Sequence, residues 1–331
     1  MTGLLASVRA QPTAVDTLRR ALAADRVHHA YLFDGADGVG KERAAIGLAQ
    51  ALVCERRAPG EADACGVCRA CVRAVPRPGE GRPLHPDVVV LERGLYDPVT
   101  IGRRSPETQD LSIDQVRTLV LARAAFPPLE GRAKVFILRR AEELSPPAAN
   151  ALLKTLEEPG PRTHFVLLSA VADSLLPTIR SRTQRVRFGP LPDDVVTDLL
   201  GAQGVENAAA IAVLAGGSMA SAVLLSDPEA SARRDEFVAR AMASLTARDL
   251  GPALELAEEA KKVGKEGVAA QLEALAAALG GQARTAASSG ERTADVAAAR
   301  HDLAVAAMQQ LDANASTQLA LEAMFIKMRS A

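Results

Sequence analysis

The sequence predicts an α/β protein whose first part is a parallel β-sheet covered by helices and whose last part is all helical. Three observations indicate this fold class. Short β-branched or apolar runs alternate with helical patterns up to about residue 190, a glycine-rich turn follows the first of these runs, and the strand signal disappears after Pro190. Alternation of strands and helices is typical of parallel sheets with right-handed crossover connections.

Five runs are expected to be strands. Most of them are continuously apolar, as strands are when helices cover both faces of a parallel sheet. The predicted strands are Ala30–Phe33, Val88–Leu91, Val135–Leu138, His164–Leu168 and Val186–Phe188.

Two of the intervening helices have recognisable start signals. Ser112 is followed three residues later by Gln115, a pair whose side chains bond to free backbone N–H groups at the start of a helix. Ser145 precedes Pro146, and proline is favoured at the first position of a helix. We expect this second helix to end at Pro159.

The length of 331 residues predicts about two or three domains. The predicted domains are an α/β domain at 1–190, a small helical domain at 191–227 and a helical domain at 228–331. The stretch Arg93–Gln109 lacks periodicity and is expected to be a solvated loop, and Gly280–Arg292 is expected to connect two helices. The last two helical segments, about 293–312 and 315–329, carry apolar residues on one side that pack either within a bundle or against another subunit.

The composition is that of an ordinary globular chain. Apolar residues make up 48% and charged residues 24%, which excludes disorder of the whole chain. The formal net charge is −1, so no overall field attracts the chain to nucleic acid or to an acidic membrane. No apolar run approaches the length of a membrane span, and the N-terminus lacks the pattern of a secretory signal. We therefore expect a cytoplasmic protein without a membrane partner.

All four cysteines of the chain lie within residues 54–71. Cys65, Cys68 and Cys71 form a C-x-x-C-x-x-C pattern, and Cys54 precedes them. Two thiolates separated by two residues can turn onto one metal ion, and four thiolates satisfy tetrahedral Zn²⁺ at roughly 2.3 Å each. The pattern predicts a zinc site with all four cysteines as ligands. Such a site is structural, because it has no open position for catalysis.

Three alternatives stay open for these cysteines: two disulfides, unconnected free thiols, and an iron–sulfur cluster. Disulfides are rare in the reducing compartment expected here. Buried free thiols would be scattered through the apolar segments, whereas these cysteines lie among residues such as Arg56, Pro59 and Gly66. The spacing therefore favours zinc.

The first predicted strand is followed by the turn Gly35-Ala-Asp-Gly-Val-Gly40-Lys41-Glu42 and then by an apolar helix to Val53. This turn fits the phosphate-binding pattern G-x-x-x-x-G-K, in which backbone N–H groups converge on an anion and the lysine adds positive charge. Gly35, Gly40 and Lys41 are the candidate nucleotide-binding residues. Glu42 replaces the hydroxyl residue that would hold Mg²⁺, so binding of ATP or ADP stays open. The alternative is a tight turn that only joins a strand to a helix.

These features occur in one order with further motifs. The motifs are His28–Gly35, the glycine-rich turn, the four cysteines, Ala149–Pro159 with its run Leu-Leu-Lys-Thr-Leu-Glu-Glu-Pro, and Ser181-Arg182-Thr183. Together they resemble the bacterial clamp-loader AAA+ family, which comprises the gamma/tau and delta prime subunits of DNA polymerase III. The resemblance covers roughly residues 7–220. It implies an AAA+ P-loop domain with an inserted zinc module, a helical lid domain and a C-terminal helical collar for oligomerisation.

The chain departs from active ATPase members of that family where the resemblance assigns hydrolysis. Arg139-Arg140 replaces the Asp-Glu pair that positions Mg²⁺ and polarises water. Ser169-Ala170 replaces the usual Thr or Asn sensor, and Gly216–Ala220 lacks the arginine that follows Gly-Ser in active relatives. With Glu42, these departures imply no intrinsic ATPase or polymerase chemistry and no catalytic residue in cis.

Arg182 is retained, and the resemblance gives it a role in a neighbouring subunit. In the family's Ser-Arg-Cys motif this arginine reaches the γ-phosphate bound next door, where a guanidinium stabilises charge on the transferring phosphoryl group. Thr183 replaces the family's cysteine without removing the charge. The alternative is a solvated surface arginine, as some of Arg180, Arg185 and Arg187 must be. A subunit that cannot hydrolyse ATP but keeps this finger resembles the delta prime branch.

The resemblance thus implies a non-hydrolysing subunit of the DNA-directed DNA polymerase III holoenzyme. Its expected partners are the gamma/tau and delta subunits in a hetero-oligomer and, through that complex, the sliding clamp and primer-template DNA during replication. Three rival functions are an active AAA+ ATPase of the gamma/tau type, a P-loop nucleotide kinase with a zinc-bound lid, and a zinc-ribbon DNA-binding protein. The missing acidic pair counts against the first, the unexplained helix Asn150–Pro159 against the second, and the lack of aromatic stacking platforms against the third.

Overall fold

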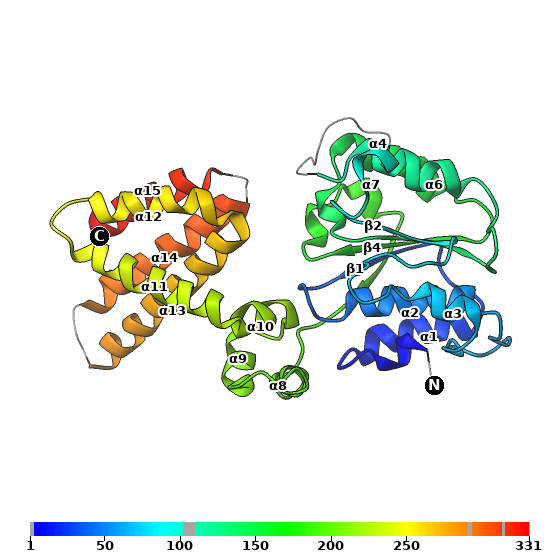
Figure 1. Ribbon diagram of the computed structural model, residues 1–331, viewed down its shortest axis with the longest axis horizontal. Helices are drawn as coiled ribbons and strands as arrows, with labels where there is room; N and C mark the ends of the chain where they lie inside the picture. The colour runs from blue at the N-terminus through cyan, green and yellow to red at the C-terminus, as the bar shows by residue number, and fades with distance from the viewer. Residues whose placement is uncertain (1–2, 102–109, 290–292, 313–314, 331) are drawn as a thin grey trace. The chain divides into compact units, whose positions relative to one another are not determined.

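The computed structural model of the chain describes residues 3–101, 110–289, 293–312 and 315–330. These residues form two compact units, Met1–Leu224 and Leu225–Ala331. The first unit contains a five-stranded sheet covered by helices, and the second is all helical (Figure 1). The further boundary at residues 190–191 stays a prediction.

The sheet has the strand order β2-β3-β4-β1-β5, and every neighbouring pair is parallel. Its strands are β1 (Ala30–Asp34), β2 (Val88–Leu91), β3 (Lys134–Leu138), β4 (Thr163–Ser169) and β5 (Gln184–Arg187). Each strand overlaps one of the five predicted runs, and the two differ by no more than about two residues at either end. The predicted fold class is therefore confirmed.

Helices cover both faces of the sheet (Figure 1). On one face lie α1 (Pro12–Ala23), α2 (Lys41–Val53) and α3 (Arg69–Ala74). On the other lie α4 (Ile113–Gln115), η3 (Val116–Leu121), α5 (Ala122–Ala124), α6 (Pro146–Glu157) and α7 (Pro177–Arg180). Because successive strand residues point to opposite faces, Tyr31 and Phe33 of β1 enter one core and Leu32 enters the other. Burial on both faces explains the continuously apolar runs.

Both predicted helix starts are confirmed. The side chain of Ser112 accepts the backbone N–H of Gln115, and the side chain of Gln115 accepts the backbone N–H of Ser112. The helix that follows runs through α4, a π-helical turn at η3, and α5. Pro146 is the first residue of α6, which ends shortly before Pro159 as expected.

Short 3₁₀ turns complete the connections of the first unit: η1 (Leu4–Ser7), η2 (Pro98–Ile101), η4 (Ala141–Glu143) and η5 (Ala172–Ser174). The predicted solvated loop Arg93–Gln109 is described only as far as Ile101, and residues 102–109 lie outside the described residues. Its first part is not wholly solvated, because Ile101 at the end of η2 is buried against the sheet.

Three helices follow the sheet in the chain, as expected for the small helical segment: α8 (Asp193–Gly201), α9 (Ala208–Leu214) and α10 (Met219–Ser226). The turn before α10 contacts the glycine-rich turn directly, since the hydroxyl of Ser218 donates to Asp37 O at 2.7 Å. The N–H of Leu191 donates to Gly217 O at 2.9 Å. These bonds hold the turn before α10 against the glycine-rich turn and against Leu191.

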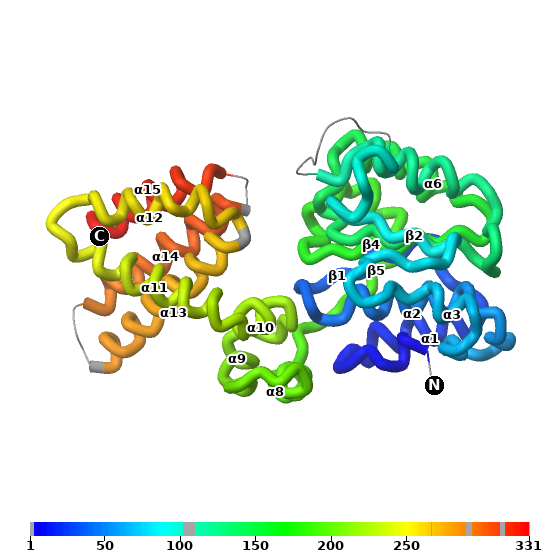
Figure 2. Tube along the Cα trace, viewed as in Figure 1, coloured from blue at the N-terminus to red at the C-terminus, as the bar shows by residue number. Residues whose placement is uncertain are grey.

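The second unit is a helical bundle traced in Figure 2. Its helices are α11 (Pro228–Thr246), α12 (Gly251–Val263), α13 (Lys265–Ser289), α14 (Thr293–Asp312) and α15 (Thr317–Ser330). Leu311, Leu321 and Phe325 are buried inside this bundle, whereas Leu319 is 63% exposed. Packing within the chain is therefore what buries most of the apolar side of the last two helices. Among the helices of the described ranges, none combines the length and apolarity that crossing a membrane requires.

The expected helix connection at Gly280–Arg292 is wrong for residues 280–289. Helix α13 continues through Gly280 and Gly281 to Ser289, and only 290–292, which lie outside the described residues, are left for the connection. A Cβ on Gly280 would lie 3.3 Å from the ring of His301 in α14. Gly280 therefore lets two helices approach closely, and the packing outweighs its cost of about 1 kcal/mol in a helix.

The space at Gly47 in α2 is too small for even a methyl group. A Cβ there would lie 2.5 Å from the backbone nitrogen of Leu5 and 2.7 Å from its Cα. Gly47→Ala should lower the free energy of unfolding by about 1–3 kcal/mol, because η1 must move away from α2. Chemical denaturation followed by circular dichroism measures this change.

Gly201→Ala is the matched control, because no other atom lies within 4 Å of a Cβ at that helical position. We expect it to be neutral or to stabilise by up to about 1 kcal/mol. Equal losses of stability in the two variants would contradict the close packing of α2 on η1.

Candidate functional site

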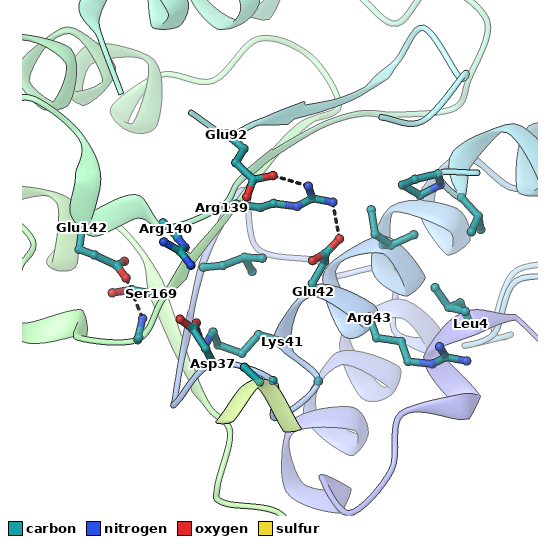
Figure 3. Close-up of a pocket in the computed structure, with 18 residues that line it drawn as sticks. Leu4, Asp37, Lys41, Glu42, Arg43, Glu92, Arg139, Arg140, Glu142 and Ser169 are labelled. Carbon is teal, nitrogen blue, oxygen red and sulfur yellow. Dashed lines mark hydrogen bonds and ion pairs between the residues drawn. The ribbon is translucent and has the colours of Figure 1, made fainter. Parts of the chain in front are cut away.

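The glycine-rich turn joins β1 to α2 and lines a cavity of about 620 Å³ (Figure 3). Gly38 and Gly40 have φ angles of 79° and 102°, which glycine adopts without strain. A Cβ on Gly38 would lie 2.2 Å from the backbone nitrogen of Ala220. The turn thus requires glycine for its own conformation and for its contact with the start of α10.

The ammonium group of Lys41 is bonded to its own turn. Its Nζ donates to Gly35 O and, at 2.7 Å, to Ala36 O, and it lies 3.4 Å from Asp37 Oδ1. An ammonium group has three donors, so these contacts use all of them. The side chain is only 7% exposed. An incoming phosphate would have to replace these bonds to reach Lys41.

Arg139 bridges two carboxylates across the same cavity (Figure 3). It follows β3 directly, and its guanidinium pairs with Glu42 at the start of α2 and, at 2.5 Å, with Glu92 after β2. Its Nη2 also donates to Gly81 O at 3.2 Å. The side chain is 13% exposed. The carboxylate of Glu42 is therefore neutralised by the guanidinium of Arg139.

Arg140 lines the cavity beside Arg139 and lies 3.4 Å from Glu143 Oε1. Its backbone has φ 46° and ψ 57°, a left-handed conformation that is uncommon for a residue with a side chain. Two cations thus lie at the end of β3 in this cavity. That they replace an acidic pair needed for hydrolysis stays a prediction.

Sequence reasoning missed three acidic residues of this cavity: Asp37, Glu92 and Glu142. Glu142 Oε1 accepts the N–H of Ala170 at 3.2 Å, and its buried Oε2 has no hydrogen-bond partner among the described residues. Ser169 of β4 lies beside Glu142 (Figure 3). The sequence carries no local signal for Glu92, because its role depends on an arginine far along the chain.

The four cysteines come together at the far end of α2. Cys54 ends that helix, Cys68 caps the start of α3, and Cys71 lies within α3. All four Sγ atoms lie within 4.8 Å of one another. Cys54 Sγ and Cys68 Sγ are 4.0 Å apart, and Cys65 Sγ and Cys71 Sγ are 3.9 Å apart. All four cysteines are free in this structure, and both separations are far longer than the roughly 2.05 Å of a disulfide.

The sulfur spacing fits a tetrahedral ion. Ligands roughly 2.3 Å from a central Zn²⁺ lie roughly 3.8 Å from one another, close to both measured separations. Backbone N–H groups donate to three of the sulfurs, those of Cys54, Cys65 and Cys68. The N–H of Val67 contributes most to lowering the pKa of Cys65 to about 6, whereas burial raises the pKa of Cys71. The cluster is therefore suited to hold a cation that stabilises thiolates.

Arg182 lies in a second cavity, of about 450 Å³. It follows α7, and its guanidinium pairs with Glu157 at the end of α6 and donates to Thr178 O at 2.9 Å. None of the described residues that line this cavity also lines the first one. Arg182 is thus outside the chain's own phosphate-loop cavity.

The neighbouring arginines have local partners. Arg180 pairs with Asp173 at 2.7 Å, and Arg185 pairs with Asp34 at the end of β1 at 2.6 Å. The pair with Asp34 raises the pKa of Arg185. Arg187 is exposed at the end of β5. Arg180 and Arg185 therefore brace this end of the sheet, and Arg182 is the arginine of the group that lines the second cavity.

Comparisons with known proteins identify relatives among replication proteins. The chain is 34% identical over 228 residues to the delta prime subunit of DNA polymerase III from Bacillus subtilis, which covers 69% of this chain and 60% of the relative. It is 40% identical over 166 residues to the delta prime subunit from Pseudomonas aeruginosa, covering 50% of this chain and 44% of that one. A gamma/tau subunit from Mycobacterium bovis is 35% identical over 195 residues, 59% of this chain and 30% of the relative.

The chain thus spans between about a third and three-fifths of the length of these relatives. Among solved structures, a DNA polymerase III gamma subunit-related protein from Thermotoga maritima is 18% identical with a TM-score of 0.46, covering 95% of this chain and 98% of that one. The sequence model of the family described as "DNA polymerase III, delta subunit" matches residues 10–192, more than half of the chain. This protein therefore belongs to that clamp-loader family of DNA polymerase III subunits.

Proposed function

We propose that this chain is a clamp-loader subunit of the delta prime type that does not hydrolyse ATP itself. It supplies Arg182 in trans to a neighbouring ATPase subunit and helps to load the sliding clamp on primed DNA. The observation that carries this proposal is the Arg139 bridge. At the end of β3, where the resemblance places the hydrolytic groups, Arg139 is paired with Glu42 and Glu92.

Hydrolysis in cis lacks its acidic groups in this arrangement. Phosphoryl transfer needs a carboxylate to hold Mg²⁺ and a group to orient the attacking water. At the end of β3 the cavity has Arg139 and Arg140, and the carboxylates of Glu42 and Glu92 are paired with Arg139. Lys41 is bonded to its own turn, so Gly35, Gly40 and Lys41 keep the form of a phosphate loop without a free cation.

Arg182 suits a role in trans because it lies in a cavity separate from the phosphate loop. A guanidinium that approaches a γ-phosphate stabilises the charge that develops as the phosphoryl group transfers. The partners proposed on this basis are the gamma/tau and delta subunits, with the sliding clamp and primer-template DNA reached through the complex. The helical bundle α11–α15 is proposed as the collar that holds the subunits together.

The four-cysteine cluster is proposed to bind one Zn²⁺ through Cys54, Cys65, Cys68 and Cys71. Four thiolates close the coordination sphere, so the ion is structural. Its place at the end of α2 supports a bracing role, because the same helix begins at Lys41 of the glycine-rich turn.

The isolated chain is expected to show no steady-state ATP turnover above background, because Arg139 and Arg140 occupy the positions of the acidic pair. A coupled phosphate-release assay on the purified chain measures this. The gamma/tau-type alternative requires turnover that disappears in Lys41→Ala, and that result would overturn the proposal of a non-hydrolysing subunit.

Arg182→Ala should abolish the contribution of one interface to ATP hydrolysis by the assembled clamp loader. Arginine fingers contribute about 10³-fold or more to the rate of phosphoryl transfer, so turnover at the neighbouring site should fall by about that factor. DNA-stimulated ATPase and clamp loading by the reconstituted complex are the measurements.

Arg187→Ala is the control for that experiment, because Arg187 is exposed and lines neither cavity described above. The control should retain normal turnover. A complex with Arg182→Ala that hydrolyses ATP and loads clamps at the normal rate would remove the proposed role in trans.

Elemental analysis of protein purified under reducing conditions without chelator should find one zinc per chain. Cys68→Ser should lose the metal and destabilise the region around α3, because the ion no longer holds it, whereas a serine hydroxyl still caps the helix. Protein that contains no zinc, or that contains iron with the absorption of an iron–sulfur cluster, would contradict this assignment.

A further inference from the structure

The guanidinium of Arg182 is engaged on both sides within its own chain. Nε donates to Glu157 Oε1 at 2.7 Å, and Nη2 donates to the same oxygen. Nη1 donates to Thr178 O at 2.9 Å and lies 3.3 Å from Ser181 Oγ. The edge formed by Nε and Nη2, whose two parallel donors can grip an oxyanion, is thus occupied by a carboxylate.

Glu157 also cancels the charge of Arg182 within the second cavity. The other described residues that line this cavity are His28, His29, Leu156, Ser181, Thr183 and Gln184. Burial, and then the neighbouring His28, lowers the pKa of His29, so that ring is uncharged at neutral pH. Arg182 and Glu157 are therefore the only permanently charged side chains among those residues, and together they are neutral.

The position of Glu157 gives no advantage to its own helix. It is the last residue of α6, where the helix dipole disfavours negative charge. Helix stability therefore does not account for the carboxylate. The ion pair with Arg182 accounts for it, because the positive guanidinium offsets the unfavourable interaction of the carboxylate with the helix dipole.

We propose that Glu157 is a positioning residue that holds Arg182 in a neutralised resting state and competes with a neighbouring subunit's γ-phosphate for the same guanidinium edge. This inference rests on the proposed role of Arg182 in trans. Both competitors offer anionic oxygens to the same donors, so a phosphate oxygen takes the place of Glu157 Oε1. The cavity beside the pair gives such a group access to the guanidinium.

The exposure of the pair makes this exchange easy. The side chains of Arg182 and Glu157 are 33% and 47% exposed, and ion pairs that are this accessible to water contribute at most about fivefold to an equilibrium. Glu157 therefore weakens the binding of Arg182 to a γ-phosphate without preventing it. A nucleotide without a γ-phosphate does not reach this edge and does not compete.

The test uses the assembled clamp loader with Glu157→Gln, which keeps the shape of the side chain and removes its charge. The affinity of the complex for ATPγS should rise about two- to fivefold, whereas its affinity for ADP should not change. A purely structural role would shift both nucleotides or neither. An unchanged affinity for ATPγS, or an equal shift for both nucleotides, would overturn the inference.

Two further variants separate this inference from the proposed function. Arg182→Ala alone should weaken ATPγS binding and turnover; if it changes neither, the proposed role of Arg182 itself fails. In the double variant of Arg182→Ala and Glu157→Gln, the affinity for ATPγS relative to that for ADP should equal that of Arg182→Ala alone. If Arg182→Ala has its effect but the gain persists in the double variant, Glu157 does not act through Arg182, and only the present inference falls.

Glu158→Gln is the matched control, because it makes the same change of charge one residue further on. Glu158 is exposed and forms no ion pair with the described residues. This variant should bind ATPγS and ADP as the unmodified complex does. A gain equal to that of Glu157→Gln would assign the effect to net charge and would overturn the inference.

Discussion

The bridge from Arg139 to Glu42 and Glu92 is the interaction on which the phosphate-loop cavity depends. A guanidinium buried to this degree is costly unless it is paired, and its partners come from the start of α2 and the end of β2. Arg139 therefore ties the start of α2 to the end of β2 beside the glycine-rich turn. Glu42, Glu92 and Arg139 thus balance one another's charges within the cavity.

Helix α2 connects the glycine-rich turn to the cysteine cluster. It begins at Lys41, whose ammonium group closes the glycine-rich turn, and it ends at Val53, directly before Cys54, the first of the clustered cysteines. Most of its residues are buried between these ends. The phosphate loop and the cysteine cluster are thus the two ends of one rigid element, and a metal ion bound to the cysteines would hold in place the helix that carries the loop.

The two cavities differ in how their charges are arranged, and the proposed role in trans rests on this difference. The first cavity contains many charged groups that are bonded to one another, with Glu142 Oε2 as a buried oxygen without a partner among the described residues. The second contains one arginine and one carboxylate in a pair that water reaches easily. Burial makes the Arg139 bridge difficult to exchange, and exposure makes the Arg182 pair easy to exchange.

The sequence by itself determined the strands, the helix starts, the glycine-rich turn and the grouping of the cysteines, because each depends on residues close together in the chain. It failed at Gly280, where contact with His301 of another helix outweighs a local signal for a break. Only the tertiary structure decided that Arg139 offsets Glu42, 97 residues away, and that Arg182 rests against Glu157, 25 residues away. Charges so far apart in sequence meet only when the sheet and its helices bring them together, and no local pattern specifies which carboxylate an arginine will find.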